Sequence, residues 1–580
     1  MGWRNGGGLG GMAALFAVGC GFLGASLGGG LSEGRLPLVF TQLAKTGKND
    51  VARIVRLSKT GAVEVLSRGF FSARDPHVSF DGKRILFSGR RSASEFWQIY
   101  ELDLETRAVR QLVRAEMDCR SPIYQSSLYV LASELPWRQV AFIGSVPGSA
   151  PSLYTVRLDG SDLVRISYNP YGDFDAAMME DGRMLYAARQ RDRIEPGPPE
   201  RLALFGLNLD GTDVALYGAL EGAPYKRMPV ATSGGLVVFI ESDQPRSDGA
   251  GRLGAVSQRR PFRSYQRLTD PSEGLYLYPS ALPDGEILVS RLPAGGKGTY
   301  GIVRFDPASR RSAPVFDDPA WHDIQAQLVA GRPIPDGRSS VVEPREPTGE
   351  LYCLNAYISD LPRQSWPAPG TPLRFRVVEG ALSAAQAGSG ILARRILGEF
   401  RADEDGSFKL RVPANIPIEL QLLDAGGMML RSCRWIWVRN KEARGCIGCH
   451  EDPELTPENR YATALARPAI NLTLPPERRR TLSFRRDVSP VFQAKCAGSG
   501  CHSGAVPPRL AEKSDFAAYL APAARTSPLV WRLHGKKTPL AWEQIEGDGA
   551  FPLMPPPGSA PLTEDERLTI IEWIDLGAQP

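Results

Sequence analysis

The sequence has no long apolar run after residue 30, which excludes helices that cross a bilayer beyond that point. It also has no basic patch interleaved with aromatic residues, and its net charge is only +5 over 580 residues. Nucleic acid is therefore not an expected partner. Histidine is scarce: the chain has five, and two of them directly follow a cysteine. A chain of this length is expected to form about two to four domains.

Residues 1–30 have the features of an export signal. One arginine, Arg4, precedes an apolar run, and small residues follow. The stretch "AVGC" resembles the lipobox of bacterial lipoproteins, in which Cys20 would be acylated, although the usual leucine three residues before it is missing. A plain cleaved signal and a short uncleaved anchor are the alternatives. All three place the rest of the chain in the periplasm or elsewhere outside the cytoplasm, and acylation would anchor it to a membrane.

We expect residues 36–345 to form one domain, in which a repeat with a period of about fifty residues runs from residue 36 to about 310. In each repeat an apolar strand is followed by a second strand, and Asp-Gly pairs such as Asp81-Gly82 open several first strands as hairpin turns do. The aligned central residues of the first strands are Phe40, Phe87, Phe142, Tyr186, Phe239 and Val289. The pattern predicts a mainly β fold with a six-bladed β-propeller. A seventh blade in 310–345 is the alternative. The phrase "DPHVSFDGKRILFSG" resembles blades of TolB-like propellers, which implies a fold only.

A proline-rich linker at Pro344–Pro347 precedes residues 350–440. These residues contain short strands of alternating apolar and polar residues, two of which are joined by a "DEDGS" turn. This pattern predicts a β-sandwich-like middle domain. Cys353 and Cys433 both lie in it. In an exported chain a structural disulfide between them is favoured slightly over two free buried thiols, and the geometry decides between the two.

The stretch "RGCIGCHED" carries the C-x-x-C-H pattern of c-type cytochromes, with Cys446, Cys449 and His450. Two thiols at this spacing add across the two vinyl groups of haem, and the adjacent histidine then lies under the iron. A zinc site would need two further ligands nearby, and none follows in the sequence. We expect residues 441–475 to form the first c-haem segment.

The stretch "KCAGSGCHSG" has four residues between Cys496 and Cys501, followed by His502. It resembles the start of a class I cytochrome c domain, in which a helix with an aromatic residue, here Phe492, leads into the haem cysteines. The longer gap is a known variant, and its small residues can bulge without a clash. A Cys496–Cys501 disulfide is the alternative.

The end of the chain favours haem at this second motif. Met554 lies in a proline-rich loop ahead of a terminal helix that a Thr563–Glu566 capping box starts. In the class I pattern the loop methionine is the second axial ligand of the iron. We therefore expect residues 483–580 to form a cytochrome c domain with His502 and Met554 as iron ligands, and the chain to carry two covalently bound haem c groups.

The first haem has no equally clear second ligand in the sequence. The candidates, none of which is favoured, are Tyr461, His77, His322, His534 and Cys119.

A run of arginines precedes the second motif. Its members are Arg478, Arg479, Arg480, Arg485 and Arg486. They predict either a face that steers an acidic redox partner or an ordinary solvated linker.

The order of propeller, β-sandwich ending in "WIWVRNKEARGCIGCH" and C-terminal cytochrome resembles the hydrazine synthase alpha subunit family over nearly the whole exported chain. The resemblance implies two c-type haems, the first catalytic and the second an electron relay, and other subunits as partners. In that family a tyrosine four residues after the motif histidine ligates iron, and the histidine binds zinc. This chain has Glu454 at that position.

Two functions of different classes follow. The first is an exported dihaem c-type cytochrome that transfers electrons, with the propeller as a docking platform. The second is a haem-dependent oxidoreductase that acts on a small nitrogen compound at the Cys446/Cys449 haem. A propeller binding module with a cytochrome tether is a third possibility. Two protein ligands on the first iron would favour electron transfer, whereas an open position would favour an enzyme.

Overall fold

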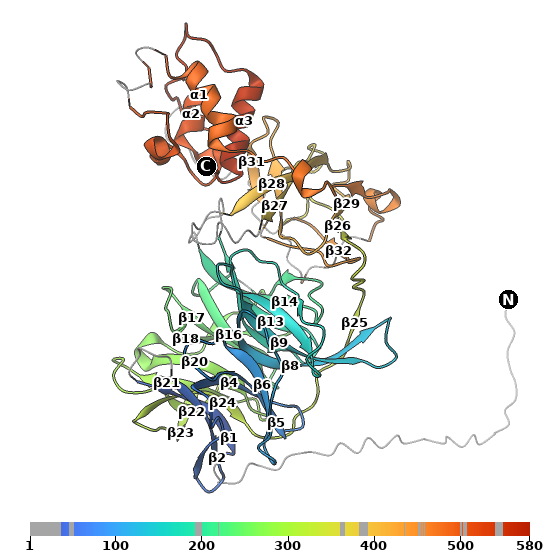
Figure 1. Ribbon diagram of the computed structural model, residues 1–580. Helices are drawn as coiled ribbons and strands as arrows, with labels where there is room; N and C mark the ends of the chain where they lie inside the picture. The colour runs from blue at the N-terminus through green and yellow to red at the C-terminus, as the bar shows by residue number, and fades with distance from the viewer. Residues whose placement is uncertain are drawn as a thin grey trace, which may run out of the picture.

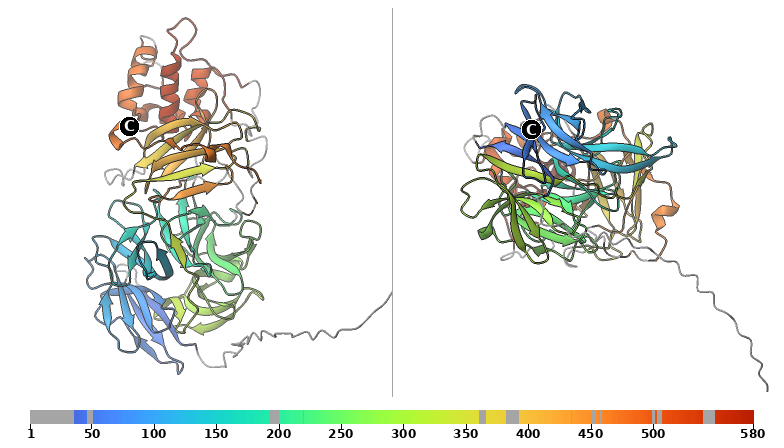
Figure 2. Two further views of the ribbon diagram at one scale, coloured as in Figure 1. Left: turned by 90° about the vertical axis from the view of Figure 1, so that its right-hand side faces the viewer. Right: turned by 90° about the horizontal axis from the view of Figure 1, so that it is seen from below.

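The computed structural model describes residues 36–45, 51–191, 200–218, 220–359, 366–381, 392–433, 435–449, 454, 456, 459–498, 501–502, 507–539 and 549–580. The predicted export signal with Cys20 and the motif histidine His450 lie outside these residues. Three parts are stacked along one axis: a ring of β-sheets, a β-sandwich and a helical C-terminal domain (Figures 1 and 2). Within the described ranges, no helix has the length and apolarity needed to span a bilayer.

The ring consists of six antiparallel blades of four strands each, and every blade but the first is formed by consecutive strands. A parallel strand pair joins the fourth and fifth blades into one eight-stranded sheet, and a fifth strand extends the third blade. From the innermost strand outward, the blades are β24 (Trp321–Leu328), β1 (Leu38–Ala44), β2 (Ala52–Leu57), β3 (Val63–Val65); β4 (Ser72–Val78), β5 (Arg84–Arg90), β6 (Gln98–Asp103), β7 (Val109–Gln111); β8 (Asp118–Val130), β9 (Trp137–Ser145), β10 (Ser152–Arg157), β11 (Val164–Arg165); β12 (Asp173–Met178), β13 (Met184–Gln190), β14 (Arg201–Leu207), β15 (Ala215–Leu216); β16 (Tyr225–Ala231), β17 (Leu236–Ser242), β18 (Arg252–Ser257), β19 (Gln266–Arg267); β20 (Gly274–Ala281), β21 (Ile287–Pro293), β22 (Gly301–Asp306), β23 (Arg311–Phe316).

The last strand of the ring closes it by completing the first sheet. β24 pairs antiparallel with β1, with Leu38 opposite Leu328. The innermost strands of neighbouring sheets contact one another all the way round, from β4 to β24 and back to β4. The expected propeller-like ring is thus present with six sheets. The seven-bladed alternative is wrong, because residues 310–345 supply β23, β24 and the short β25 (Arg338–Ser340), which pairs with β8.

The repeat in the sequence corresponds to the second strand of each sheet. All six aligned central residues, from Phe40 to Val289, are buried between sheets. Gly82, in the Asp81-Gly82 turn, has φ 73°, and a Cβ there would lie 2.7 Å from the carbonyl carbon of Ala330. Glycine is therefore needed at this turn both for its conformation and for the close approach of the chain.

A left-handed residue interrupts every innermost strand. The six residues are Asp75, Ser121, Asp175, Met228, Tyr278 and Gln325, with φ between 50° and 60°. Several link neighbouring sheets through side-chain-to-backbone hydrogen bonds. The Asp75 amide donates to Gln325 Oε1 (3.0 Å), and the Ser121 amide donates to Asp75 Oδ2 (3.1 Å). Burial opposes ionisation of Asp75, but the Arg120 guanidinium at 2.7 Å holds the pKa of this carboxyl well below its usual range.

The middle domain is a sandwich of two four-stranded sheets, as predicted. One sheet contains β32 (Ala443–Cys446), β26 (Thr348–Cys353), β29 (Phe408–Pro413) and β33 (Ile470–Asn471); the other contains β28 (Ala393–Arg401), β27 (Arg374–Ala381), β30 (Ile418–Leu423) and β31 (Met429–Ser432). Leu351, Phe375 and Leu410 pack in the core between them. Because β32 and β33 belong to the sandwich, both ends of the expected first c-haem segment, 441–475, lie in this domain.

The C-terminal domain is helical. Its helices are α1 (Ser489–Lys495), α2 (Pro528–His534) and α3 (Glu564–Asp575), with a π-turn at Phe484–Val488 and short 3-10 segments at Lys513–Tyr519 and Ala524–Thr526. Phe484, Phe492, Phe516 and Trp573 form an aromatic core with ring centroids 5.5 to 6.4 Å apart. The predicted capping box starts α3, with the Glu566 amide donating to Thr563 Oγ1 (3.1 Å) and the Thr563 amide to Glu566 Oε2 (2.8 Å).

Helix α3 fastens the C-terminal domain to the sandwich. Glu572 is buried; its Oε1 accepts a hydrogen bond from Arg376 Nη2 (2.8 Å), and its Oε2 forms an ion pair with Arg480 Nη2 at 2.5 Å. Asp575 accepts from the backbone amides of Met429 (3.0 Å) and Ala524 (2.8 Å). Figure 1 shows the helices directly against the end of the sandwich that carries β31. The two parts are therefore held in one orientation by buried charged contacts.

Two candidate haem-attachment sites

The first motif lies on the strand edge of the sandwich. Cys446 ends β32, which runs parallel to β26, and Cys353 is its partner in register. The Cys449 amide donates to the Ile358 carbonyl (3.0 Å). Between the two cysteines, Gly448 passes so close to Ile358 that a Cβ would overlap the Ile358 carbonyl oxygen. The backbone of the C-x-x-C stretch is thus fixed, and both of its thiols are half-buried.

A third thiol lies beside this motif. Cys353 is buried and hydrogen-bonds to Cys449, and this bond together with burial raises the pKa of the Cys353 thiol well above its usual range. The favoured Cys353–Cys433 disulfide is absent, since both cysteines are free thiols. Cys433 follows β31 in the opposite sheet, where its sulfur accepts from the Leu420 amide (3.1 Å). Among the described residues no three metal-binding side chains form a cluster.

The stretch that precedes the motif is anchored in the ring. The Trp437 indole donates to the Gly211 carbonyl (3.0 Å), and Arg439 Nε donates to the Asp210 carbonyl (2.9 Å). Glu442 Oε1 accepts from the Asp213 amide (2.8 Å). These three partners, Asp210, Gly211 and Asp213, lie in the ring, in the segment of chain just after β14. The first motif therefore lies where the ring and the sandwich meet.

Glu454 extends this junction beyond the motif. Its carboxylate accepts from the Phe262 amide (2.8 Å) and from Arg260 Nε (3.3 Å), both in the loop that follows β18. Nearly two hundred residues separate the partners, so no local pattern in the sequence indicates this contact. The motif histidine, His450, lies outside the described residues, so its expected place under the iron remains a prediction.

The other candidate ligands of the first haem are spread over the molecule. His77 on β4, Cys119 on β8 and His322 on β24 all belong to ring sheets, and none of these strands pairs with β32 in the described chain. Tyr461 is 74% exposed, and His534 ends α2 in the C-terminal domain. These positions single out none of the five as a ligand.

The second motif follows α1 directly. The Cys496 amide donates to the Phe492 carbonyl (2.8 Å), the Cys501 amide to the Gly498 carbonyl (3.0 Å) and the His502 amide to the Cys496 carbonyl (3.0 Å). This compact turn brings both cysteines and the histidine together despite the longer gap. Both thiols are free, so the alternative Cys496–Cys501 disulfide is absent.

The His502 ring is oriented by a backbone carbonyl. Its Nδ1 lies 2.9 Å from the Pro508 oxygen, which can only accept, so Nδ1 carries the proton. Nε2 then keeps its lone pair. Histidines that bind metals characteristically donate their other ring nitrogen in this way, which fixes both tautomer and ring orientation.

Met554 lies in a loop held against α2. Its amide donates to the Arg532 carbonyl (2.8 Å), and the nearby Phe551 ring packs edge-on against Trp531 at 5.4 Å. The side chain is half-buried. The loop has a fixed place in the helical domain, which suits the predicted role of Met554 as an axial ligand.

The predicted basic face is mostly neutralised. Arg479 Nη1 pairs with Glu379 (2.7 Å), Arg480 pairs with Glu572, and Arg486 pairs with Asp487 (2.9 Å). The arginine run therefore holds the linker to the sandwich and to the C-terminal domain. Arg485 is 82% exposed, and its partner Glu512 is 4.0 Å away.

Comparisons with known proteins support the resemblance inferred from the sequence. Residues 374–451 match the family model described as the hydrazine synthase alpha subunit middle domain, and this range includes the whole first motif. The chain is 25% identical to hydrazine synthase subunit alpha from Kuenenia stuttgartiensis over 93% of this chain and 91% of that protein. The solved Kuenenia stuttgartiensis hydrazine synthase matches with a TM-score of 0.76 at 24% identity, covering 94% of each chain. A tricorn protease homolog from Saccharolobus solfataricus is 32% identical over 25% of this chain and 12% of its own length.

The predicted relationship to the hydrazine synthase alpha subunit is thus confirmed over nearly the whole chain. The mainly β architecture with a propeller-like ring is confirmed as well.

Proposed function

We propose that this chain is an exported c-type cytochrome with two covalently attached haems that passes electrons as one subunit of a larger assembly. The observation that carries the proposal is the hydrogen bond between His502 Nδ1 and the Pro508 carbonyl. In a disulfide-bonded loop this ring would have no need of a fixed tautomer. Beside two thiols in one compact turn, the same bond prepares Nε2 to bind iron.

The residues of the C-terminal domain fit a haem. Cys496 and Cys501 would form the thioether bonds, His502 would bind one face of the iron and Met554 the other. A bound haem supplies reversible one-electron exchange. The chain contributes a buried aromatic core around Phe492, which limits solvent access and so affects the redox potential.

The first motif fits a haem through its fixed backbone and its two half-buried thiols. Cys446 and Cys449 would form the thioether bonds, and His450 would be the adjacent ligand. The buried contacts of Glu572 and Asp575 keep this domain and the helical domain in one orientation. A constant separation of the two haem sites is what an electron relay needs.

A haem-dependent oxidoreductase acting on a small nitrogen compound is the second candidate. Glu454 stands where the related family has an iron-ligating tyrosine, and its carboxylate accepts hydrogen bonds from Phe262 and Arg260 of the ring. If no other residue takes its place, the first iron keeps an open position where a substrate can bind. The name of the related hydrazine synthase favours a nitrogen compound as that substrate.

The same proposal implies a cellular location and a set of partners for the protein. The export signal implies a periplasmic or other extracytoplasmic location, and acylated Cys20 would add a lipid anchor. The related protein is named as a subunit, so other subunits and a redox protein are expected partners. The neutralised arginines argue against a purely basic docking face.

Spectroscopy of the purified protein tests both candidates. Two six-coordinate low-spin haems in the EPR spectrum would support electron transfer. A high-spin signal from one haem, lost in the Cys446→Ala/Cys449→Ala variant, would favour the oxidoreductase. Absence of covalent haem would overturn both.

A further inference from the structure

A third thiol, Cys353, is held against the first motif by paired backbone. β26 and β32 run parallel with Cys353 opposite Cys446, and the pairing continues beyond both strands. The Leu354 amide donates to the Cys446 carbonyl (2.9 Å), and the Asn355 amide donates to the Ile447 carbonyl (3.2 Å). The segment that carries Cys353 therefore lies side by side with the segment that enters the motif.

The motif then turns so that Cys449 approaches Cys353. The Cys449 amide donates to the Ile358 carbonyl (3.0 Å), and Gly448 packs so closely there that a Cβ would lie 2.4 Å from the same carbonyl oxygen. The turn is thus fixed on both sides of Gly448, and the Cys353 thiol hydrogen-bonds to Cys449. Two sulfur atoms in this contact can bond covalently after a small rotation of either side chain.

Cys433, the fourth thiol of the sandwich, makes a different contact. It follows β31 in the opposite sheet, and its sulfur accepts a hydrogen bond from the Leu420 amide (3.1 Å). Leu420 belongs to β30, so this bond lies within the sheet that carries Cys433. Of the two sandwich cysteines outside the motif, Cys353 is therefore the better placed to react with it.

We propose that Cys353 and Cys449 form a disulfide while the first motif carries no haem, and that this disulfide must be reduced before haem is attached there. A sulfur held in a disulfide cannot add across a haem vinyl group. The second motif has no third thiol, because Cys496 and Cys501 are the only cysteines in residues 483–580. The effect on haem attachment rests on the proposed function, whereas the disulfide itself does not.

The disulfide forms through two thiol–disulfide exchanges with an external disulfide such as oxidised glutathione. Cys449 is half-exposed, so its sulfur attacks the external disulfide and releases one thiol. The buried Cys353 then attacks the Cys449 sulfur and releases the second thiol. The two protein thiols lose two protons and two electrons, and the external disulfide gains both as it becomes two thiols. Exchange in the reverse direction, with an external thiol as reductant, restores the motif.

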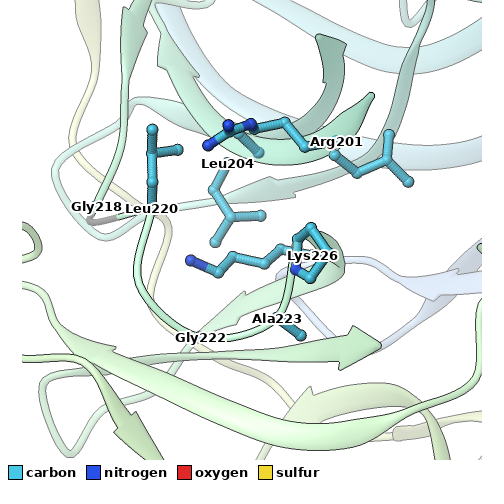
Figure 3. A pocket seen from close by; sticks show the side chains of 10 residues that line it. Arg201, Leu204, Gly218, Leu220, Gly222, Ala223 and Lys226 are labelled. Carbon is cyan, nitrogen blue, oxygen red and sulfur yellow. The ribbon is translucent and has the colours of Figure 1, made fainter. Parts of the chain in front are cut away.

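Cys119 on β8 provides a reference thiol in the ring. It is fully buried, and burial raises the pKa of its thiol to about 12, so an external disulfide reacts with it slowly. The cavity of about 130 Å³ on the side of the ring does not expose it, since none of the ten residues that line this cavity is a cysteine (Figure 3). Oxidation of the haem-free chain is therefore expected at the first motif and not at Cys119.

Peptide mapping of the full chain, produced without haem-maturation machinery and equilibrated with oxidised glutathione, tests the disulfide. Remaining thiols are blocked with N-ethylmaleimide before a non-reducing digest and mass spectrometry. The Cys353–Cys449 link should be present, lost in Cys449→Ala, and retained in Cys446→Ala and Cys119→Ala. A Cys446–Cys449 link, a Cys353–Cys433 link or maleimide on both Cys353 and Cys449 would overturn the proposal.

Haem attachment in a host with the maturation machinery tests the consequence. The ratio of haem at the first motif to haem at the second should fall when oxidised glutathione is added to the culture, because only the first motif has a third thiol. In Cys353→Ala this ratio should not change. A ratio that falls equally in both proteins would overturn the effect on attachment and leave the disulfide intact. A mapped disulfide in a chain that never carries haem would overturn the proposed function but not the disulfide.

Discussion

The two cysteine motifs of this chain contrast in spacing and in surroundings. The first has the usual C-x-x-C-H spacing, but it lies on a β-strand edge, beside a third thiol and against the ring. The second has an enlarged gap, yet it follows a helix, forms a compact turn and has an oriented histidine. The surroundings of the two motifs therefore differ more than their spacings do: the second lies within one helical domain, whereas the first is built into an interface between two parts of the molecule.

Removal of the cysteines of either motif should have the largest effect, which is a loss of covalently bound haem. Cys496→Ala/Cys501→Ala and Cys446→Ala/Cys449→Ala should each lower the covalent haem content from two to one, because each pair forms both thioether bonds of one haem. Quantitative haem staining with intact mass measures this. Cys353→Ala and Cys119→Ala are matched controls and should keep both haems. Loss of the first haem in Cys353→Ala would mean that the third thiol is a point of attachment.

Replacement of Met554 tests whether its sulfur is the second axial ligand of the proposed C-terminal haem. Met554→Ala should lower the potential of the C-terminal haem and remove the near-infrared band of His/Met ligation, because sulfur ligation raises the potential. Potentiometry with optical detection measures both properties. Leu553→Ala, at the exposed neighbouring residue, should change neither. If Met554→Ala also leaves them unchanged, His534 is the next candidate.

The joint between the sandwich and the helical domain should be stabilised by its buried charges. Glu572→Gln should destabilise the helical domain by about 3 kcal/mol, because it removes one of the two carboxylates that pair with buried Arg376, the other being Glu399. Arg485→Gln, which removes an exposed pair, should cost at most about 1 kcal/mol. Denaturant unfolding followed through the haem absorbance compares them. Similar values would show that the joint contributes little.

The smallest expected effect concerns the start of α3. Thr563→Ala removes the side-chain acceptor of the Glu566 amide and should cost about 1 kcal/mol. Thr563→Ser keeps the acceptor and should be close to neutral. The same unfolding measurement distinguishes the two variants, and equal losses would argue against the cap.

Local patterns predicted the elements of this fold well. The buried central residues from Phe40 to Val289 marked the repeated strands, and Thr563 with Glu566 marked the start of α3. The innermost strands were harder to predict, since the left-handed residue in each, such as Asp75, breaks the alternation that identifies a strand.

Contacts between distant segments could not be predicted in the same way. The arginine run looked like a docking face because its partners, Glu379 and Glu572, lie about a hundred residues away in either direction. The state of Cys353 and Cys433 also depends on the geometry between distant residues: both are free thiols, which their spacing along the sequence does not reveal. The partner of Glu454, Phe262, was equally hidden.

The mass of the intact mature protein, produced in a host with haem-maturation machinery, tests the central claim most directly. The account predicts the polypeptide plus two haems, and digestion should assign one to Cys446/Cys449 and the other to Cys496/Cys501. A mass with a single haem and a Cys496–Cys501 disulfide would contradict it.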